Sequence, residues 1–562
     1  MVQRRPRAPS TASRPTPSPA AAGTSATRQI ASALGLEGER MSKVDTAWLR
    51  MDSPTNLMMI LGVWVLRPSI TLEALRERVR ERMLPFSRFV QIAREDATGA
   101  HWLDDPDFRL ERHVSTHRLV RRRGQSEQAA LQARVAALAI QPLDHRHPLW
   151  QFELIEDYEG GSALVARIHH CIADGIALIG VMMSLVDDGH APSRRQPRTA
   201  ATHTGLDAAE DWVADSLIRP FGDLAARALD LAGDGAAKSF SALASPQQSL
   251  SGSVDQALEI ARLGGQLASD LAALALMPDD SPTPLKGQPV GRKHVAWCDP
   301  VPLDEVKAIG KGLNCSVNDV LLSCAAGAIG RYLRARGTDT AGVEIRAMVP
   351  VNLRPMEEAW KLGNRFGLVP LVLPVGIENP IERVYAVRAR MAALKGSLQP
   401  LLTFGLLSVA GLLVKPAQDA LLALFGRKTT AVMTNVPGPA RKLRFCGATL
   451  EQTLFWVPQT GTVGLGVSIL SYGGGVQFGV AGQCLGAGFS QTGLDVARQG
   501  GAVVRSLVQR IGFHGLQAGE KQAHADFVRG EQGIGLLVLI FVDDARPAVE
   551  LVQRKIVETA IV

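Results

Sequence analysis

The chain has 562 residues, of which 46% are hydrophobic and 20% are charged; this is the balance of a folded globular protein and excludes a chain that is disordered throughout. The first 28 residues contain no acidic residue and five arginines: Arg4, Arg5, Arg7, Arg14 and Arg28. These arginines supply most of the net charge of +7, so the remaining chain carries +2 (7 − 5). The folded part therefore has neither the basic stripe nor a recognisable module of a nucleic-acid-binding protein, and we expect no nucleic-acid partner.

The length predicts two packed domains with additional segments, because single cores rarely grow beyond about 250–300 residues. No apolar run reaches the roughly 18–20 residues of a membrane span, since Lys415, Pro416 and Asp419 interrupt the longest one, at 401–425. Residues 1–40 lack a secretory signal and are predicted to form a disordered basic tail. Six scattered cysteines without a CxxC pair argue against disulfides or a zinc site and indicate a reducing cytosol: Cys171, Cys298, Cys315, Cys324, Cys446 and Cys484.

Order is expected to begin near Met41. The apolar run 57–66 predicts a buried strand, and Ser69 is expected to cap the helix that follows it, up to Met83. A second amphipathic helix is predicted at 127–139, capped by Ser126. The alternation of residues 150–157 then predicts a strand with one apolar face: Trp150, Phe152 and Leu154.

The string RIHHCIADGIALIG, at 167–180, combines a strand end with a helix start. The alternation over 163–170 predicts a strand on which His169 and His170 face opposite sides of the sheet. Asp174 is placed to cap a strongly apolar helix over 175–185, which is expected to be buried, and Gly175 to allow close backbone packing at the turn. The prediction is one imidazole at a strand end in an apolar environment.

A histidine is the natural general base near neutral pH. No GxSxG elbow and no Cys/His pattern accompanies the pair, so the sequence indicates direct attack by an alcohol or amine of the substrate. The alternative is that either histidine is only a hydrogen-bonded core residue.

Beyond residue 190 the amino-acid composition changes. Residues 191–290, rich in small residues, predict a helical connector with helices at 206–217 and 254–276. Residues 291–512 return to mixed α/β, and residues 513–562 form a tail of unknown role. Strands are predicted in the second half at 293–299, 344–351, 367–375, 429–434, 461–471 and 476–481.

HHCIADG matches the HHxxxDG signature of the CoA-dependent acyltransferase superfamily. With further motifs in order over roughly residues 41–500, the chain resembles the bacterial wax ester synthase/diacylglycerol acyltransferase family. The motifs are MSKVDTAWLRMDSPTNLMMI (41–60), PLDHRHPLWQFELIE (142–156), SVNDVLLSCAAGAI (316–329), VPVNLRP (349–355), LGNRFG (362–367), TNVPGP (434–439) and SYGGGVQFGV (471–480).

The resemblance implies an α/β fold of two chloramphenicol-acetyltransferase-like domains, 41–190 and 291–512, joined by the helical connector around a central substrate tunnel. It implies acyl transfer from acyl-CoA, as co-substrate, to diacylglycerol or a long-chain fatty alcohol, giving triacylglycerol or wax ester. No other cofactor and no metal is implied. The protein is expected in the cytoplasm, peripherally associated with a membrane or lipid inclusions.

The resemblance also implies residue roles. His170 would be the base, with His169 as support, and Asn318 would donate to the oxyanion or, alternatively, cap the helix 319–333. Asp174 would orient its loop by capping or by pairing with an arginine. Gly175 completes the set of site candidates.

Several features keep structural interpretations beside functional ones. Trp150 is expected to anchor core packing, and residues 435–439 to form a rigid turn. Arg121–Arg123 are either a solvated surface cluster or a site for CoA phosphates. The segment 401–425 either dips into lipid or forms core helices, and both alternatives stay open.

Two departures from the family pattern stand out. The usual Ser-Tyr-Asp-Gly reads Ser471-Tyr472-Gly473-Gly474, so a carboxylate that could shape this loop is missing, and the sequence after residue 481 is unfamiliar. The altered C-terminal motifs keep open the alternative of a catalytically decayed lipid-surface protein. A second rival function is a condensation-type acyltransferase that takes its acyl group from a carrier protein.

Overall fold

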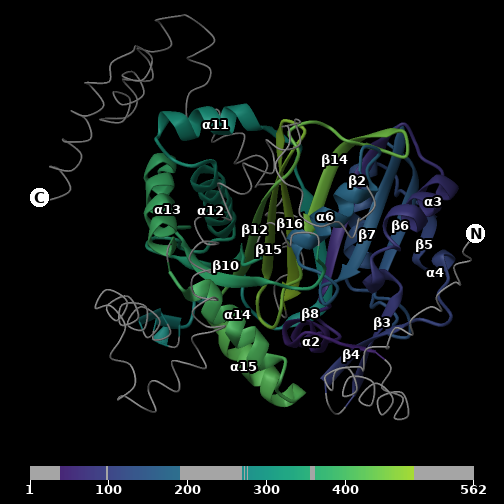
Figure 1. The fold of residues 1–562 in the computed structure, drawn as a ribbon. Coiled ribbons are helices and arrows are strands. Elements are labelled where there is room, and N and C mark those ends of the chain that lie inside the picture. The colour runs from purple at the N-terminus through teal and green to yellow at the C-terminus, as the bar shows by residue number, and fades with distance from the viewer. Residues whose placement is uncertain are drawn as a thin grey trace, which may run out of the picture.

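The computed structural model describes residues 38–96, 99–189, 269–270, 273–274, 276–354, 361–395 and 397–485 (Figure 1). The predicted tail at 513–562 and the connector helix at 206–217 lie outside these residues, as do residues 1–37 of the predicted N-terminal tail and most of the helix predicted at 254–276.

A six-stranded sheet carries the histidine pair. Its order is β13-β14-β2-β7-β6-β5, antiparallel except for the parallel pair of β5 and β6. The two central strands, β2 and β7, are apolar along nearly their whole length and buried on both faces, which confirms the strands predicted at 57–66 and 163–170. The strands are β2 Met59–Arg67, β5 Val114–Arg118, β6 Trp150–Tyr158, β7 Gly161–His169, β13 Arg444–Phe445 and β14 Ala448–Trp456.

Five helices accompany this sheet, and all but the short helix at Leu110–His113 begin at a side-chain cap. Ser126 and Asp174 cap their helices as predicted. The cap of the first predicted helix is Thr71 and not Ser69, because Ile70 is buried on the sheet and donates its N–H to Ser162 Oγ (3.3 Å), which keeps the chain extended up to residue 71. The helices are α2 Lys43–Arg50, α3 Leu72–Arg82, α4 Leu110–His113, α5 Glu127–Leu138 and α6 Gly175–Leu185.

A second, mixed sheet forms the other half of the molecule. Its order is β11-β10-β12-β15-β16-β8, with β9 added to β16. The six strands predicted from 293 to 481 are confirmed, although the fourth continues to Pro437. The strands are β8 Pro289–Trp297, β9 Val301–Pro302, β10 Ile345–Asn352, β11 Phe366–Leu373, β12 Ala431–Pro437, β15 Leu465–Tyr472 and β16 Gly475–Leu485.

Five helices accompany the second sheet among the described residues: α11 Leu303–Gly312, α12 Val317–Ala335, α13 Pro380–Leu394, α14 Gln399–Ala410 and α15 Lys415–Arg427. Within the described part of the chain, no single helix is long and apolar enough to cross a membrane; only α11 and α12 taken together, bent by 102°, meet that length and composition.

Strand β14 does not follow the order of the chain. It alternates buried and half-buried residues (Ala448, Leu450, Leu454 and Trp456 are buried) and pairs antiparallel with β2 in the first sheet (Figure 1), although in the sequence it comes between β12 and β15 of the second. The sequence analysis expected no strand here and placed these residues in a separate C-terminal domain. A pairing partner almost 400 residues earlier leaves no local signal, so chain order alone assigns this strand to the wrong sheet.

Smaller elements complete the description. A three-stranded sheet, in the order β1-β4-β3, flanks the first half; its strands are β1 Glu39–Arg40, β3 Gln91–Asp96 and β4 Gly99–Asp104, and a 3-10 turn spans Ser87–Phe89. A buried cluster joins β2, α5 and β14 of the first half to β8 of the second, through contacts such as Trp297 on Trp456 (ring centroids 5.6 Å apart). The two halves therefore share a core.

Candidate active site

The candidate site is the loop between β7 and α6. The backbone N–H of His169 donates to Leu149 O (2.9 Å), and that of His170 to Met58 O (2.7 Å). Ile172 N then donates to His169 O (3.0 Å) and closes a tight turn. Backbone hydrogen bonds to neighbouring segments thus fix the positions of both histidines at the end of β7.

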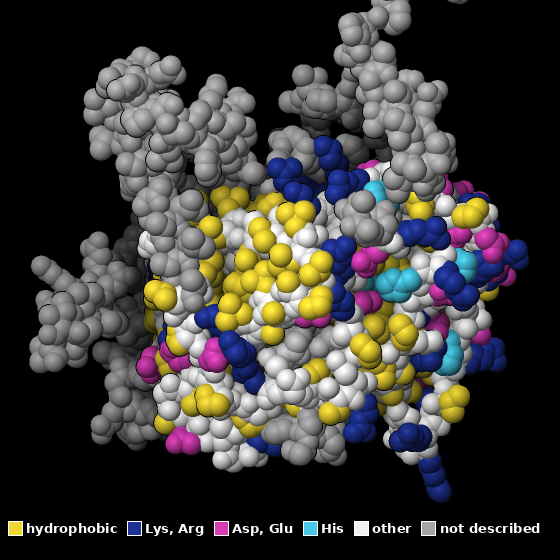
Figure 2. Space-filling view, turned by 90° about the horizontal axis from the view of Figure 1, so that it is seen from below, with side chains coloured by type: hydrophobic (Ala, Val, Ile, Leu, Met, Phe, Trp, Pro, Cys, Tyr) yellow, Lys and Arg dark blue, Asp and Glu magenta, His cyan; other side chains and the backbone are white. Residues whose placement is uncertain are grey.

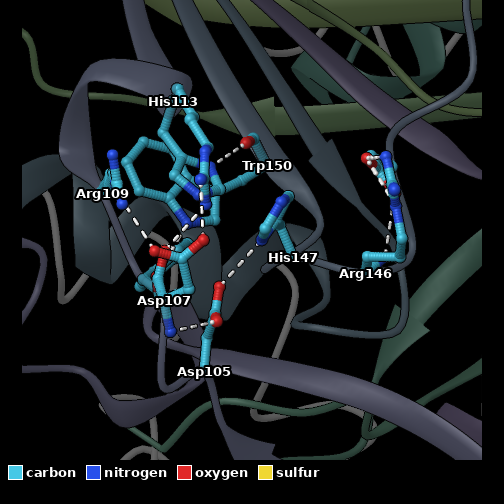
Figure 3. Close-up of polar contacts among 10 residues, drawn as sticks. Asp105, Asp107, Arg109, His113, Arg146, His147 and Trp150 are labelled. Carbon is cyan, nitrogen blue, oxygen red and sulfur yellow. Dashed lines mark hydrogen bonds and ion pairs between the residues drawn. The ribbon is translucent and has the colours of Figure 1, made fainter.

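The Pro-Leu-Trp motif beside this loop is a structural anchor. Trp150 is fully buried, donates its Nε1–H to Phe89 O (2.8 Å) and stacks on His113, with ring centroids 4.6 Å apart. Figure 3 shows this stack beside the contact of His147 Nδ1 with Asp105 Oδ2 (3.0 Å). The predicted role of Trp150 in core packing is confirmed, and its neighbour Leu149 supplies the carbonyl that holds His169.

A segment of the second half, 361–365, clamps the loop. Gly363 N donates to Ile172 O (3.0 Å), and Asp174 N donates to Gly363 O (3.2 Å). Gly363 has φ +100°, and a Cβ there would lie 3.3 Å from Asp45 Oδ2, so glycine permits the approach. The sequence analysis quoted LGNRFG as a motif but gave it no role, and no local signal connects it to the histidines.

His170 is buried and held by Asn364 and Trp48. Its Nδ1 lies 2.9 Å from Asn364 Oδ1, and its ring stacks on Trp48 of α2, with centroids 4.0 Å apart and planes 12° apart. Burial lowers the pKa of His170 to about 4, against the opposing effects of Asp174, the carbonyl of His170 itself and Asn364. The imidazole is therefore neutral at physiological pH. Asn364 and Trp48 were missed by the sequence analysis.

His169 turns to a different set of partners, as predicted. Its Nδ1 accepts the Cys171 N–H (3.1 Å), and its Nε2 lies 3.4 Å from Asp52 Oδ1. Burial raises the pKa of Asp52, but hydrogen bonds from His145 and His169, together with charge and backbone contacts, outweigh burial and hold it below its usual range. The contact with the Cys171 amide fits the supporting role expected for His169.

Asp174 has both of the alternative partners that were expected. Its Oδ1 accepts the Ala177 N–H (2.9 Å) as the cap of α6. Its Oδ2 accepts from Arg354 Nη2 (2.9 Å) and from the Arg365 N–H (2.9 Å), and both side chains of the ion pair are 4% exposed. Asp174 therefore ties the loop to the second half of the molecule.

Asn318 is not a helix cap. Ser316 caps α12 in a capping box with Asp319, and Asn318 follows as the second helical residue. Its Oδ1 accepts from Asn435 Nδ2 (2.5 Å), which leaves its NH2 group as a further donor. Asn435 belongs to β12, so the turn predicted at 435–439 begins later, after Pro437. Among the described residues, no hydrogen bond joins Asn318 to His170.

Gly175 differs from its prediction. A Cβ at this position would meet no atom within 4 Å, so close backbone packing does not explain the glycine. Gly175 instead lines an apolar cavity of about 1020 Å³, including the space at its opening. The expectation of a fully buried α6 is also wrong: Ala177 and Val181 are buried, whereas Ile179 and Met182 on the other face line this cavity.

The cavity lies where the two sheets meet. Residues of β2, β7, β14 and α6 form one side, and residues 436–439 with Leu470 and Tyr472 form the other. Nearly all lining side chains are apolar, and Thr453 contributes a hydroxyl. Ile168 and Gly175, on either side of the HHxxxDG loop, belong to the wall. The cavity therefore reaches the ends of this loop.

The remaining candidates lie elsewhere. Arg121–Arg123 are exposed, and Arg121 pairs with Glu127 (3.4 Å), as in a solvated surface cluster. Gly473 and Gly474 form the β15–β16 turn with φ +57° and +83°. Glycine adopts this left-handed conformation readily, so the turn forms although Gly473 replaces the aspartate of the family pattern. In the described ranges, no group of three or more His, Cys, Asp or Glu side chains could hold a metal ion.

Comparisons with known proteins agree on one family. A family profile described as wax ester synthase/diacylglycerol acyltransferase catalytic domain matches residues 41–321, and its C-terminal-domain counterpart matches residues 362–484. The chain is 28% identical over 421 residues to a probable diacylglycerol O-acyltransferase, tgs1, of Mycobacterium tuberculosis, covering 74% of this chain and 83% of that protein. A second putative diacylglycerol O-acyltransferase of that organism is 29% identical over 361 residues, 62% of this chain and 66% of that protein.

Among solved structures, the wax ester synthase/diacylglycerol acyltransferase from Marinobacter aquaeolei VT8 matches with a TM-score of 0.55 at 18% identity, over 84% of this chain and 100% of that chain. The likeness confirms the predicted α/β fold class of this acyltransferase family. The central tunnel stays a prediction.

Proposed function

Because the chain belongs to the wax ester synthase/diacylglycerol acyltransferase family, we propose that it transfers an acyl group from acyl-CoA to the hydroxyl of diacylglycerol or of a long-chain fatty alcohol. The observation that carries this proposal is His170, a neutral imidazole held between Trp48 and Asn364 in a loop whose flanking residues Ile168 and Gly175 line an apolar cavity. The product is triacylglycerol or a wax ester.

In the proposed reaction, the hydroxyl oxygen attacks the thioester carbonyl carbon while Nε2 of His170 takes the hydroxyl proton. The C–S bond of the resulting tetrahedral species then breaks, and the leaving CoA thiolate takes the proton from Nε2, which restores the neutral imidazole. The low pKa of His170 supports this role, because the base is unprotonated throughout the neutral range. Asp174 and Arg354 do not touch the reacting atoms in this scheme and hold the loop.

The oxyanion of the tetrahedral species needs a donor, and we assign the NH2 group of Asn318 to it. Its oxygen is already occupied by Asn435, which orients the amide and leaves only donor hydrogens. Such donors contribute roughly 3–4 kcal/mol to lowering a barrier. Acyl-CoA must bring its thioester carbonyl within reach of both Asn318 and the acceptor hydroxyl at His170, since no hydrogen bond joins Asn318 to His170 among the described residues.

We assign the cavity to an alkyl chain of one substrate. Its apolar lining suits a lipid tail, and each CH2 group moved there from water contributes about 0.8 kcal/mol. Gly175 leaves the cavity open next to the HHxxxDG loop, so a chain lying there could present its reactive end toward His170.

The test is CoA release from palmitoyl-CoA with hexadecanol and with diacylglycerol, each offered separately. Release that depends on the acceptor and is lost in His170→Ala supports the proposal and ranks the two acceptors. His117→Ala on β5, in the same sheet but away from the loop, is the matched control and should retain activity. Activity with an acyl-carrier protein alone would favour the carrier-dependent alternative, and turnover equal to that of His170→Ala would favour a decayed site.

We also propose that the protein works in the cytoplasm at a membrane or lipid-inclusion surface, which it contacts through α14 and α15. Exposed apolar side chains gather on the face where these helices lie (Figure 2): Val409, Leu412, Val414 and Leu424. Lys415 and Arg427 on these helices are paired with Asp419 (3.4 Å) and Asp279 (3.9 Å), so the exposed apolar side chains carry this proposal. The buried residues of the same helices, such as Leu407, belong to the core, which supports the core-helix alternative for that face of 401–425. Contact of the exposed face with lipid is the proposal.

Flotation with anionic phospholipid vesicles tests this surface. The double variant Leu412→Asp/Val414→Asp should float less than wild type. Val120→Asp, which changes a residue that is 89% exposed but lies on another element, should float as wild type does. Equal flotation of all three proteins would contradict the assignment.

A further inference from the structure

Asn364 lies between the proposed base and a buried carboxylate. Its Nδ2 donates to Asp45 Oδ1 (2.7 Å) and to the carbonyl oxygen of His170 (2.7 Å), while its Oδ1 faces His170 Nδ1 (2.9 Å). Asp45 Oδ1 also accepts the backbone N–H of Asn364 (2.9 Å). The amide is therefore fixed at both ends.

These partners settle which way the amide points. A carboxylate and a carbonyl are both acceptors, so the group that faces them is the NH2. The remaining amide oxygen can only accept, and His170 Nδ1 must therefore carry the hydrogen. Nε2 is then the unprotonated nitrogen, which is the form a general base needs.

Helix α2 supplies both restraints on the imidazole. Asp45 fixes Asn364, and Trp48, three residues later and thus on the same helix face, stacks on the His170 ring. Both side chains are buried, with Asp45 6% and Trp48 7% exposed. A carboxylate this deep is costly unless it is hydrogen-bonded, and Asn364 provides two of its bonds.

We infer that Asn364, held by Asp45, is a positioning residue that keeps His170 in the Nδ1–H tautomer and fixes the orientation of its ring. The inference rests on the role of His170 proposed above. Neither Asn364 nor Asp45 touches the reacting atoms; both act through the imidazole.

Other charged groups near this pair are accounted for. Asp174, itself paired with Arg354, and His169 act on the charge of His170. Asp45 faces Asn364 and Ser42, with Asp174 as a further charge and the Cys171 thiol nearby. The carbonyl of His170 is a second acceptor close to its own Nδ1, but Asn364 Nδ2 already donates to that oxygen.

The test exchanges the two side chains. In the double variant Asp45→Asn/Asn364→Asp the volume and the number of charges are unchanged, but the carboxylate now faces His170 Nδ1 directly. With the histidine rings labelled with 15N, and His170 identified by its absence in His170→Gln, NMR titration of the substrate-free protein gives the tautomer and the pKa. We expect the pKa of His170 to rise by about 1–3 units in the exchanged protein.

Asn364→Leu provides the second arm. We expect kcat to fall at least about tenfold, toward the roughly 10²–10⁴-fold that a general base contributes, with KM for acyl-CoA unchanged within about twofold. Asn379→Ala, which removes the cap of α13 away from the site, controls for lost stability and should keep kcat.

An Nε2–H tautomer of His170 in the wild-type protein or an unchanged pKa in the exchanged protein would overturn the inference, and so would an unchanged kcat in a folded Asn364→Leu protein. The NMR arm uses no substrate, so it decides the positioning role even if wild-type protein shows no acyl transfer. If Asn364→Leu fails to fold, the exchanged pair alone decides.

Discussion

Removing the Asp174 carboxylate should destabilise the protein strongly, although Asp174 is not assigned to the chemistry. The carboxylate accepts the cap bond from Ala177, a charged bond from Arg354 and the Arg365 N–H. Loss of a helix cap costs about 1 kcal/mol. Leaving a guanidinium that is 4% exposed without its carboxylate costs about 3–5 kcal/mol, and the remaining bonds from Arg354 to Gly363 O and Lys361 O reduce that figure. We therefore expect Asp174→Ala to lower the free energy of unfolding by about 3–5 kcal/mol.

Urea unfolding followed by circular dichroism measures this loss as a shift of the midpoint at constant slope. The double variant Asp174→Asn/Arg354→Met removes both charges and keeps a capping side chain, so it should lose about half as much. Asp304→Ala, which removes a carboxylate that is 94% exposed and pairs with Lys307, is the control and should change little. A loss below about 1 kcal/mol in Asp174→Ala would refute the reasoning. An ion pair that contributes so little to the free energy of unfolding cannot hold the loop in place.

Three further predictions concern pH and the cavity. Because burial lowers the pKa of His170 to about 4, kcat/KM should decline on the acid side only below about pH 5, and an acid limb near pH 6.5 would contradict a buried base. Burial raises the pKa of Asp45 to about 6, so its ionisation lowers the free energy of unfolding as the pH rises from about 4 to 6. Over this window the stability of Asp45→Asn relative to wild type, measured from urea midpoints, should increase by at most about 3 kcal/mol. No change would show that Asp45 titrates normally. Gly175→Leu should raise KM for palmitoyl-CoA at least about fivefold more than for octanoyl-CoA, because the leucine side chain enters the cavity. The control is Gly405→Ala, at a glycine of α14 with equally free space around it. If Gly175→Leu raises KM equally for both substrates, the acyl chain lies elsewhere.

The local parts of the site were readable from the sequence. Alternation over 163–169 predicts β7, and an aspartate before an apolar run predicts the start of α6; both depend on hydrogen bonds between residues close in the chain. The ordered motifs also indicated the family and therefore the fold class, which the comparisons confirm.

The partners of those local parts could not be read in the same way. Asn364 and Asp45 are 319 residues apart and meet only because the segment 361–365 docks on the β7–α6 loop. The cap prediction at Ser69 failed for a similar reason, since the sheet contact of Ile70 delays the helix start. Strand β14 joins a sheet whose other long strands lie at the beginning of the chain.

The sequence by itself determined the strand, the turn and the helix around the proposed base, because each follows from chemistry within a few residues. The tertiary structure alone decided what surrounds that base: the stacked Trp48, the amide of Asn364, the Asp174–Arg354 ion pair and the cavity beside Gly175. Burial and long-range hydrogen bonds set the pKa and the tautomer of an imidazole, and both arise only when distant segments pack together.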